Sequence, residues 1–263
     1  FAELTKERRA FILNWTKLLF AISAVICLPL YGFLSITRFD AQTGFLTAGT
    51  LTTVFYAALA VLAVLMLAGS FLQKKQLRFS IFNSRLLAVL AMVLGGVLIL
   101  CGVFDLLNIG YAILDSLDFL PAALLSGIVF VRLGVSFLLE KIANRSSITF
   151  IFPVIWALLA CVEMFRDYPQ IAGMPERTLY LLCLLCFTLF LMGHSRILGD
   201  VDFAKGTCWI NAFGFCGALF GLTMTVGEVL CFSSMTLPLS DVLLVFALSL
   251  YCLAFSFNTY AER

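Results

Sequence analysis

The sequence contains few charged residues: only 12% of its 263 residues are Asp, Glu, Lys or Arg, while 62% are hydrophobic. A soluble domain of this size carries about 25% charged residues. The shortage excludes a soluble globular domain, a disordered chain and a nucleic-acid-binding protein. Histidine is also scarce, and a single imidazole excludes a bis-histidine haem site and a histidine-rich zinc site within this chain. We expect no cofactor.

Long connections between apolar segments are missing as well. A membrane-spanning helix needs about 20 mostly apolar residues. Eight such segments are present, at residues 12–36, 46–72, 82–104, 120–141, 148–165, 178–197, 206–231 and 236–257. Because backbone groups in lipid must form hydrogen bonds within the protein, we expect an all-α polytopic membrane protein with eight transmembrane helices. The connections are too short for a separate catalytic domain, so any site has to lie among the helices or at their mouths.

The basic residues that are present lie mainly on one side of the predicted membrane. Thirteen of the 17 Lys and Arg residues fall at one set of alternating span ends, whereas the other set holds Arg38, Arg166 and Arg177. Basic residues accumulate on the cytoplasmic side of membrane proteins. We therefore expect the terminal segments 1–11 and 258–263 to be cytoplasmic and the protein to lie in the plasma membrane. The inner basic residues are expected to contact anionic lipid headgroups.

Two halves of the sequence, 12–141 and 142–257, share sequence features. Each is expected to hold four helices, so the halves would form a tandem parallel repeat. A stripe of small residues at helical spacing runs along the third and the seventh span, and each stripe ends in an outer carboxylate, Asp105 or Glu228. Small residues let helices approach closely in lipid. The stripes predict that the third and seventh helices are central and pack against each other or a partner; chance alignment of apolar segments is the alternative to duplication.

One basic residue interrupts an apolar span. Arg132 lies about 12 residues into the fourth span, or roughly 18 Å at 1.5 Å per residue, which is near the middle of the membrane. An Arg at that depth costs about 2.5–3.5 kcal/mol on insertion scales. Three interpretations remain open: a side chain that extends to the cytoplasmic interface, a structural ion pair, and a group that binds a ligand or takes part in transport.

Acidic side chains near the outer ends of the spans are further site candidates. Glu163 and Glu228 lie just inside these ends, and Asp105 and Asp241 lie at the boundary. Carboxyl groups at such positions can take up a proton or a cation. The structural alternatives are interfacial hydration and, for Glu163, a local ion pair with an Arg one helical turn away. Asn211, the polar residue that begins the stripe of the seventh span, is included with them.

The sequence offers no convincing catalytic set. Cys183 and Cys186 have the C-x-x-C spacing of redox proteins, but they lie within an apolar segment, where burial makes thiols unreactive. His194 is followed by Ser195, and neighbouring side chains on a helix do not face each other. The D-S-L-D run at 115–118 has no second copy, unlike paired magnesium-binding motifs. We therefore do not expect an enzyme.

These observations favour an integral membrane carrier or binding protein for a small molecule or ion, with its site between the two helical halves. In this interpretation Arg132 neutralises a small anionic ligand or a lipid, and the carboxylates bind a proton or a cation. The alternative is a non-enzymatic subunit or sensory module that works with another membrane subunit. The small-residue stripes and the short connections suit that alternative equally well.

Overall fold

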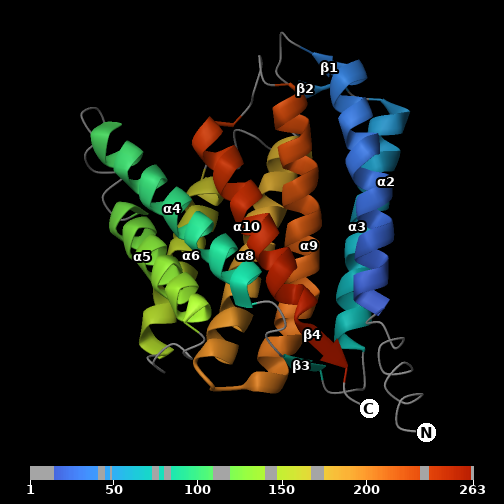
Figure 1. Cartoon of the computed structure of the whole chain (residues 1–263). Coiled ribbons are helices and arrows are strands. Elements are labelled where there is room, and N and C mark those ends of the chain that lie inside the picture. The colour runs from blue at the N-terminus through green and yellow to red at the C-terminus, as the bar shows by residue number, and fades with distance from the viewer. Residues whose placement is uncertain are drawn as a thin grey trace, which may run out of the picture.

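The structure of the protein is a computed structural model that describes residues 15–40, 45–47, 49–72, 77–79, 84–108, 119–139, 147–166, 175–231 and 237–261. These ranges contain eight α-helices: α2 (Trp15–Arg38), α3 (Thr50–Phe71), α4 (Ser84–Asn108), α5 (Phe119–Leu138), α6 (Ile151–Arg166), α8 (Pro175–Leu198), α9 (Phe203–Leu230) and α10 (Leu239–Phe257). Successive helices alternate in direction, so α2 begins and α10 ends at the same end of the bundle (Figure 1). We call this the lower end, and the end where α4, α6 and α9 stop the upper end.

Seven of these helices are long and apolar enough to span a membrane. They confirm seven of the eight predicted spans, with bounds within about four residues of those expected from the apolar runs. The exception is α6, which has 16 residues and follows a 3-10 turn over Ser147–Phe150. Pro153 lies in the first turn of α6. Backbone N–H groups in the first turn have no partner within the helix, so the N–H that Pro lacks costs the helix no hydrogen bond. The turn and α6 together cover the fifth predicted segment.

Large apolar side chains cover the outside of the bundle. On α2 and α3, Val25 is 75% exposed and Val61 is 58% exposed. The shorter helix α6 also exposes Val162 and Phe165. A continuous apolar surface is unfavourable in water and is expected where helices face lipid chains. The helices therefore indicate a membrane-embedded protein in contact with a lipid bilayer.

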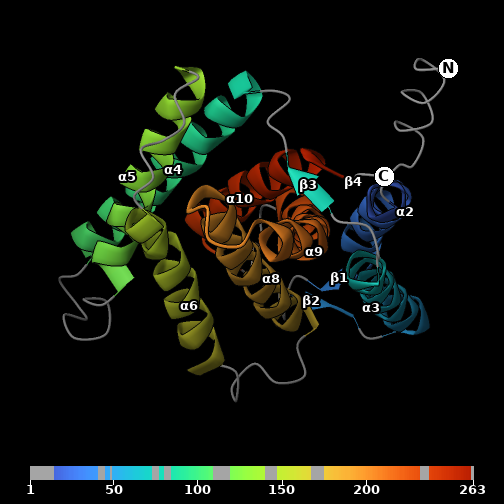
Figure 2. The same ribbon diagram turned by 90° about the horizontal axis from the view of Figure 1, so that it is seen from below.

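Helix α9 forms the centre of the bundle. It packs against α8 and α10, and on its other side against the α2–α3 pair (Figures 1 and 2). The α4–α5 pair lies beyond α10, and α6 packs between α5 and α8. Helices from the first predicted half therefore flank helices of the second half on two sides. The division of the chain at residue 141 and the tandem repeat stay predictions.

Glycines allow α9 to approach several neighbours at once. A Cβ added at Gly217 would lie 2.9 Å from the Phe187 ring of α8, and one added at Gly227 would overlap Tyr31 of α2. On a third face, Gly221 meets a serine of α10. The small residues of the seventh span thus do what the sequence predicts, which is to pack a central helix closely in lipid.

The third span is packed differently. A Cβ added at Gly95 of α4 would lie 2.6 Å from the carbonyl oxygen of Gly127 in α5, so these two backbones are in contact. The main contacts of α4 are with α5 and α10, and α4 stands at one side of the bundle (Figure 2). The prediction that the third helix is central is wrong, and of its two packing alternatives, the seventh helix or a partner, the first is not what the contacts show, because α4 packs most closely against α5. A stripe of small residues indicates a close neighbour but does not identify which helix it is.

Two short antiparallel strand pairs lie at the two ends of the bundle. At the upper end, β1 (Phe39–Asp40) pairs with β2 (Phe45–Leu46). At the lower end, β3 (Leu77–Phe79) pairs with β4 (Thr259–Ala261) (Figure 1). The segment predicted as a C-terminal tail is therefore hydrogen-bonded, in part, to the α3–α4 connection.

Candidate functional site

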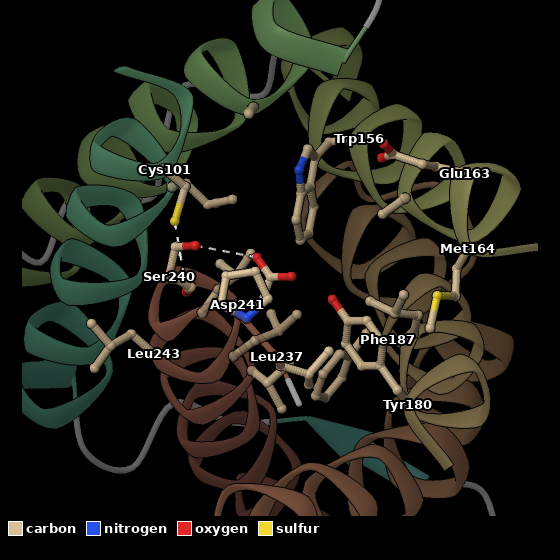
Figure 3. Close-up of a pocket in the computed structure, with 18 of the residues that line it drawn as sticks. Cys101, Trp156, Glu163, Met164, Tyr180, Phe187, Leu237, Ser240, Asp241 and Leu243 are labelled. Carbon is tan, nitrogen blue, oxygen red and sulfur yellow. Dashed lines mark hydrogen bonds between the residues drawn. The ribbon is translucent and has the colours of Figure 1, made fainter. Parts of the chain in front are cut away.

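A cavity opens at the upper end of the bundle between α4, α5, α6, α8 and α10 (Figure 3). Its volume of about 790 Å³ lies within the range of small-molecule sites. Residues from both predicted halves line it. Along α8 the lining extends from Arg177 to Phe187, which is about 15 Å of helix. Because the hydrocarbon core of a bilayer is about 30 Å thick, the cavity reaches toward the middle of the membrane.

Three charged side chains from three helices surround the mouth of the cavity. Glu163 lies near the end of α6, Arg177 in the first turn of α8, and Asp241 in the first turn of α10. A carboxylate in the first turn of a helix interacts favourably with the helix dipole. The Ser240 hydroxyl donates to Asp241 Oδ1 at 3.5 Å, and the Cys101 thiol donates to the Ser240 carbonyl oxygen at 3.8 Å. The second bond connects α4 to the start of α10.

Aromatic and aliphatic side chains line the cavity below its charged mouth. Trp156 and Tyr180 project into it from α6 and α8, and Phe187 lies deeper on α8 (Figure 3). Trp156 is 2% exposed and Phe187 is fully buried, so packing fixes both rings. At the floor lie Leu98 and Leu248, each 1% exposed. Aromatic and aliphatic side chains alternate along the lining, since Leu184 lies between Tyr180 and Phe187 on α8.

A buried cluster closes the bundle between the floor of the cavity and the lower end. His194 Nε2 and the Tyr251 hydroxyl are 2.6 Å apart and share a hydrogen bond. The rings of Phe130, Phe190 and Phe255 pack around this pair, and none of the five residues is more than 2% exposed. We call these five residues the aromatic plug. The single histidine of the sequence thus has a packing partner and a hydrogen-bond partner inside the bundle.

The cavity brings together two of the six predicted site residues, Glu163 and Asp241. Asp105 follows the cavity residue Phe104 in α4, but its side chain lies outside the described part of the structure. Glu228 is 9% exposed and lies in the last turn of α9, a helix that contributes none of the described residues lining the cavity. The prediction that Asp105 and Glu228 take up a proton or a cation stays a prediction.

Arg132 is exposed on the outward face of α5, and it is not among the described residues that line the cavity. Of its three interpretations, this position suits best a side chain that extends along the bundle toward the interface. The positive charge at the cavity comes instead from Arg177, which the sequence analysis used only as an orientation signal. The signal that identifies Arg177 is its position at the same outer boundary as Glu163 and Asp241.

Asn211 forms hydrogen bonds within the protein, away from the cavity. Its amide nitrogen donates to Thr16 Oγ1 at 3.0 Å and to Ser70 Oγ at 2.8 Å, and its amide oxygen accepts from Thr259 Oγ1 at 3.2 Å. The side chain is fully buried. These bonds connect α9 to α2, α3 and β4, so the position of Asn211 is that of a structural residue near the lower end.

The cysteines are free thiols throughout the sequence. Cys183, the first residue of the C-x-x-C motif, donates to the Gly217 carbonyl oxygen at 3.6 Å, and Cys216 donates to the Ala63 carbonyl oxygen at 3.7 Å. These thiols connect neighbouring helices through weak hydrogen bonds. Within the described ranges, no three His, Cys, Asp or Glu residues are placed to share a metal ion.

Comparison of the chain with models of protein families, with curated proteins and with solved structures finds no match. No matched protein therefore supplies a substrate, a partner or a role for any residue. The features of the molecule that bear on function are the cavity, the charges at its mouth and the plug beneath it.

Proposed function

We propose that this protein is an integral membrane carrier or binding protein for a small molecule, and that the cavity between α4, α5, α6, α8 and α10 is its site. The observation that carries the proposal is a space of about 790 Å³ with Glu163, Arg177 and Asp241 at its mouth. Ionisable residues at membrane-spanning helices are rare and commonly mark substrate pathways. An apolar cavity with a few converging polar groups is the usual form of a small-molecule site.

The aromatic plug favours a carrier over a binding protein that only holds its ligand. A carrier exposes its site to one side of the membrane while the path to the other side is closed. Here the cavity opens at the upper end and the plug fills the bundle below it. Transport would then require α8 and α10, which carry His194 and Tyr251, to separate at the plug.

The charge asymmetry of the sequence supports one orientation of this site. Most Lys and Arg residues lie at the lower span ends, which the positive-inside rule assigns to the cytoplasm. In a plasma membrane the cavity would therefore open to the outside of the cell, and a ligand would enter it from there.

Native mass spectrometry of the protein, extracted in a mild detergent from its own host, tests the proposal. We expect a bound small molecule on the wild-type protein and its loss from Ala160→Phe, which adds a ring to the cavity lining. The matched control is Ala58→Phe, because Ala58 is exposed on α3. Both variants should elute as single species with melting temperatures close to that of the wild type.

The other outcomes also decide the question. A small molecule that remains bound to Ala160→Phe would place its site outside the cavity. A wild-type protein without any bound small molecule, but with a second polypeptide at fixed stoichiometry, would contradict the proposal and favour the subunit alternative.

A further inference from the structure

Carboxylates outnumber basic groups around the cavity. Glu163 and Asp241 contribute two negative charges, and Arg177 contributes one positive charge. No lysine is among the described residues that line the cavity. A negatively charged ligand would be repelled by two carboxylates and attracted by one guanidinium. A positively charged ligand would be attracted by the net negative charge of these three groups. The electrostatics of the mouth therefore favour a cation.

Aromatic rings provide a second kind of cation contact. Phe104, Trp156, Tyr180 and Phe187 line the cavity from α4, α6 and α8. A cation within about 6 Å of an aromatic ring centroid is attracted to the face of the ring, and Trp is the strongest partner. Trp156 and Tyr180 project into the same space as Asp241 (Figure 3). Trp156 is buried by its neighbours, whereas Tyr180 keeps part of its surface exposed, so a cationic group beside Asp241 has the Tyr180 ring as its aromatic contact.

The exposed aliphatic lining of the cavity distinguishes an organic cation from an inorganic one. Leu239 and Leu243 of α10 line the cavity and are 52% and 49% exposed, so covering them with apolar groups gains free energy, and covering them with a hydrated ion does not. A metal cation needs several oxygen, nitrogen or sulfur ligands at once. The part of the chain that the structure describes holds no group of three potential metal-ligating side chains.

We propose that the ligand of this cavity is a lipophilic organic cation, whose charge lies between the carboxylates of Glu163 and Asp241 and the ring of Tyr180. Its apolar substituents cover the exposed aliphatic side chains of α10, Leu239 and Leu243. The inference rests on the proposed function and specifies the ligand class of the same site. It replaces the small anionic ligand that the position of Arg132 suggests in the sequence alone.

Two ions of matched size and shape but opposite charge test the charge preference. We would measure equilibrium binding of tetraphenylphosphonium and tetraphenylborate to the full chain in phosphatidylcholine nanodiscs. Because both ions also enter the bilayer, the signal is the difference between the wild-type protein and Ala160→Phe. We expect saturable binding of tetraphenylphosphonium that Ala160→Phe abolishes, and no such binding of tetraphenylborate.

Neutral variants of the carboxylates identify the groups responsible. Asp241→Asn and Glu163→Gln should each raise the Kd for tetraphenylphosphonium about tenfold or more, because each removes one partner of a charge pair. The matched control is Asp200→Asn, which removes the same charge from an exposed position at the lower end of the bundle, outside the described lining of the cavity. Its Kd should stay within about twofold of the wild-type value.

Failure of this inference is distinguishable from failure of the proposed function. If both ions bind in a way that Ala160→Phe abolishes, the cavity is a small-molecule site without a preference for cations, and only the inference is overturned. The same holds if neither ion binds but native mass spectrometry detects a small molecule in the cavity. If neither ion binds and no small molecule is detected, the proposed function is overturned with it.

Discussion

At the scale of single residues, the buried amide of Asn211 explains how the lower end of the bundle is held together. Its three hydrogen bonds reach Thr16, Ser70 and Thr259, which come from three different elements. An unsatisfied polar group in this environment costs about 1–3 kcal/mol, whereas individual hydrogen bonds in membrane proteins contribute less on average. Asn211 therefore contributes to stability mainly because one side chain satisfies several hydrogen-bond partners.

Replacement of Asn211 with Ala should therefore lower the free energy of unfolding by about 1–3 kcal/mol, since it leaves partner hydroxyls buried without the amide. Denaturant titration in mixed micelles would measure the change. The matched control is Asn258→Ala, because the Asn258 amide donates to the Ala254 carbonyl oxygen within its own helix. We expect a smaller loss for this control. If both variants lose the same free energy of unfolding, the hydrogen bonds between elements add nothing to the stability of the protein.

Single residues also show where sequence reasoning stops. The depth of Arg132 follows from counting along an apolar run, but the structure places its side chain on the outward face of α5. Hydrophobic periodicity gives little help there, because both faces of a membrane helix are apolar. The position of Glu163 and Asp241 near span ends predicts their place at the cavity, and Arg177 has the same position, but its charge also fits the asymmetry of basic residues across the membrane.

At the scale of helices, the close approach of α4 and α5 depends on which glycine faces the neighbour. Gly95 and Gly96 are adjacent in α4, yet a Cβ at Gly95 would lie 2.6 Å from a backbone oxygen of α5, and one at Gly96 would have open space around it. A backbone oxygen cannot move aside as a flexible side chain can. The same substitution at Gly95 and at Gly96 therefore compares a crowded position with an open one in the same helix.

Gly95→Ala should destabilise the protein by about 1–3 kcal/mol, because the two helices must separate to admit a methyl group. Gly96→Ala should be neutral or stabilising by up to about 1 kcal/mol, since Ala has the higher helix propensity. Thermal unfolding in detergent micelles would compare the two variants. A Gly95→Ala variant at least as stable as Gly96→Ala would contradict the close contact between α4 and α5.

The helices themselves were predictable, whereas the strand pairs were not. Runs of about 20 apolar residues locate each span because only a helix satisfies backbone groups in lipid. The strands β3 and β4 have three residues each and lie far apart in the sequence. Their pairing depends on the position of α10 relative to α3, which is a tertiary property. Likewise the cavity forms where faces of five helices meet, and no single segment contains that information.

At the scale of the whole molecule, the orientation in the membrane decides which compartment the cavity faces. A green fluorescent protein fused after Arg263 should fluoresce in living bacterial host cells, and alkaline phosphatase fused there should be inactive, if the lower end is cytoplasmic. The reciprocal fusions after residue 114, in the α4–α5 connection, serve as the internal control and should give the opposite result. An active phosphatase after Arg263 would contradict the predicted orientation and direct the cavity to the cytoplasm.

The central position of α9 also has a consequence for synthesis of the protein. A chain is made from its N-terminus, so α2, α3 and α8 enter the membrane before α9, against which they pack, and α10 enters after it. Until then the α2–α3 hairpin lacks the helix against which it packs, and Tyr31 lacks the contact that Gly227 later provides. The nascent protein must therefore pass through a stage of loosely associated hairpins, as larger proteins commonly do. Insertion of α9 joins the α2–α3 pair to α8, and insertion of α10 then adds its contacts with α9 and α4.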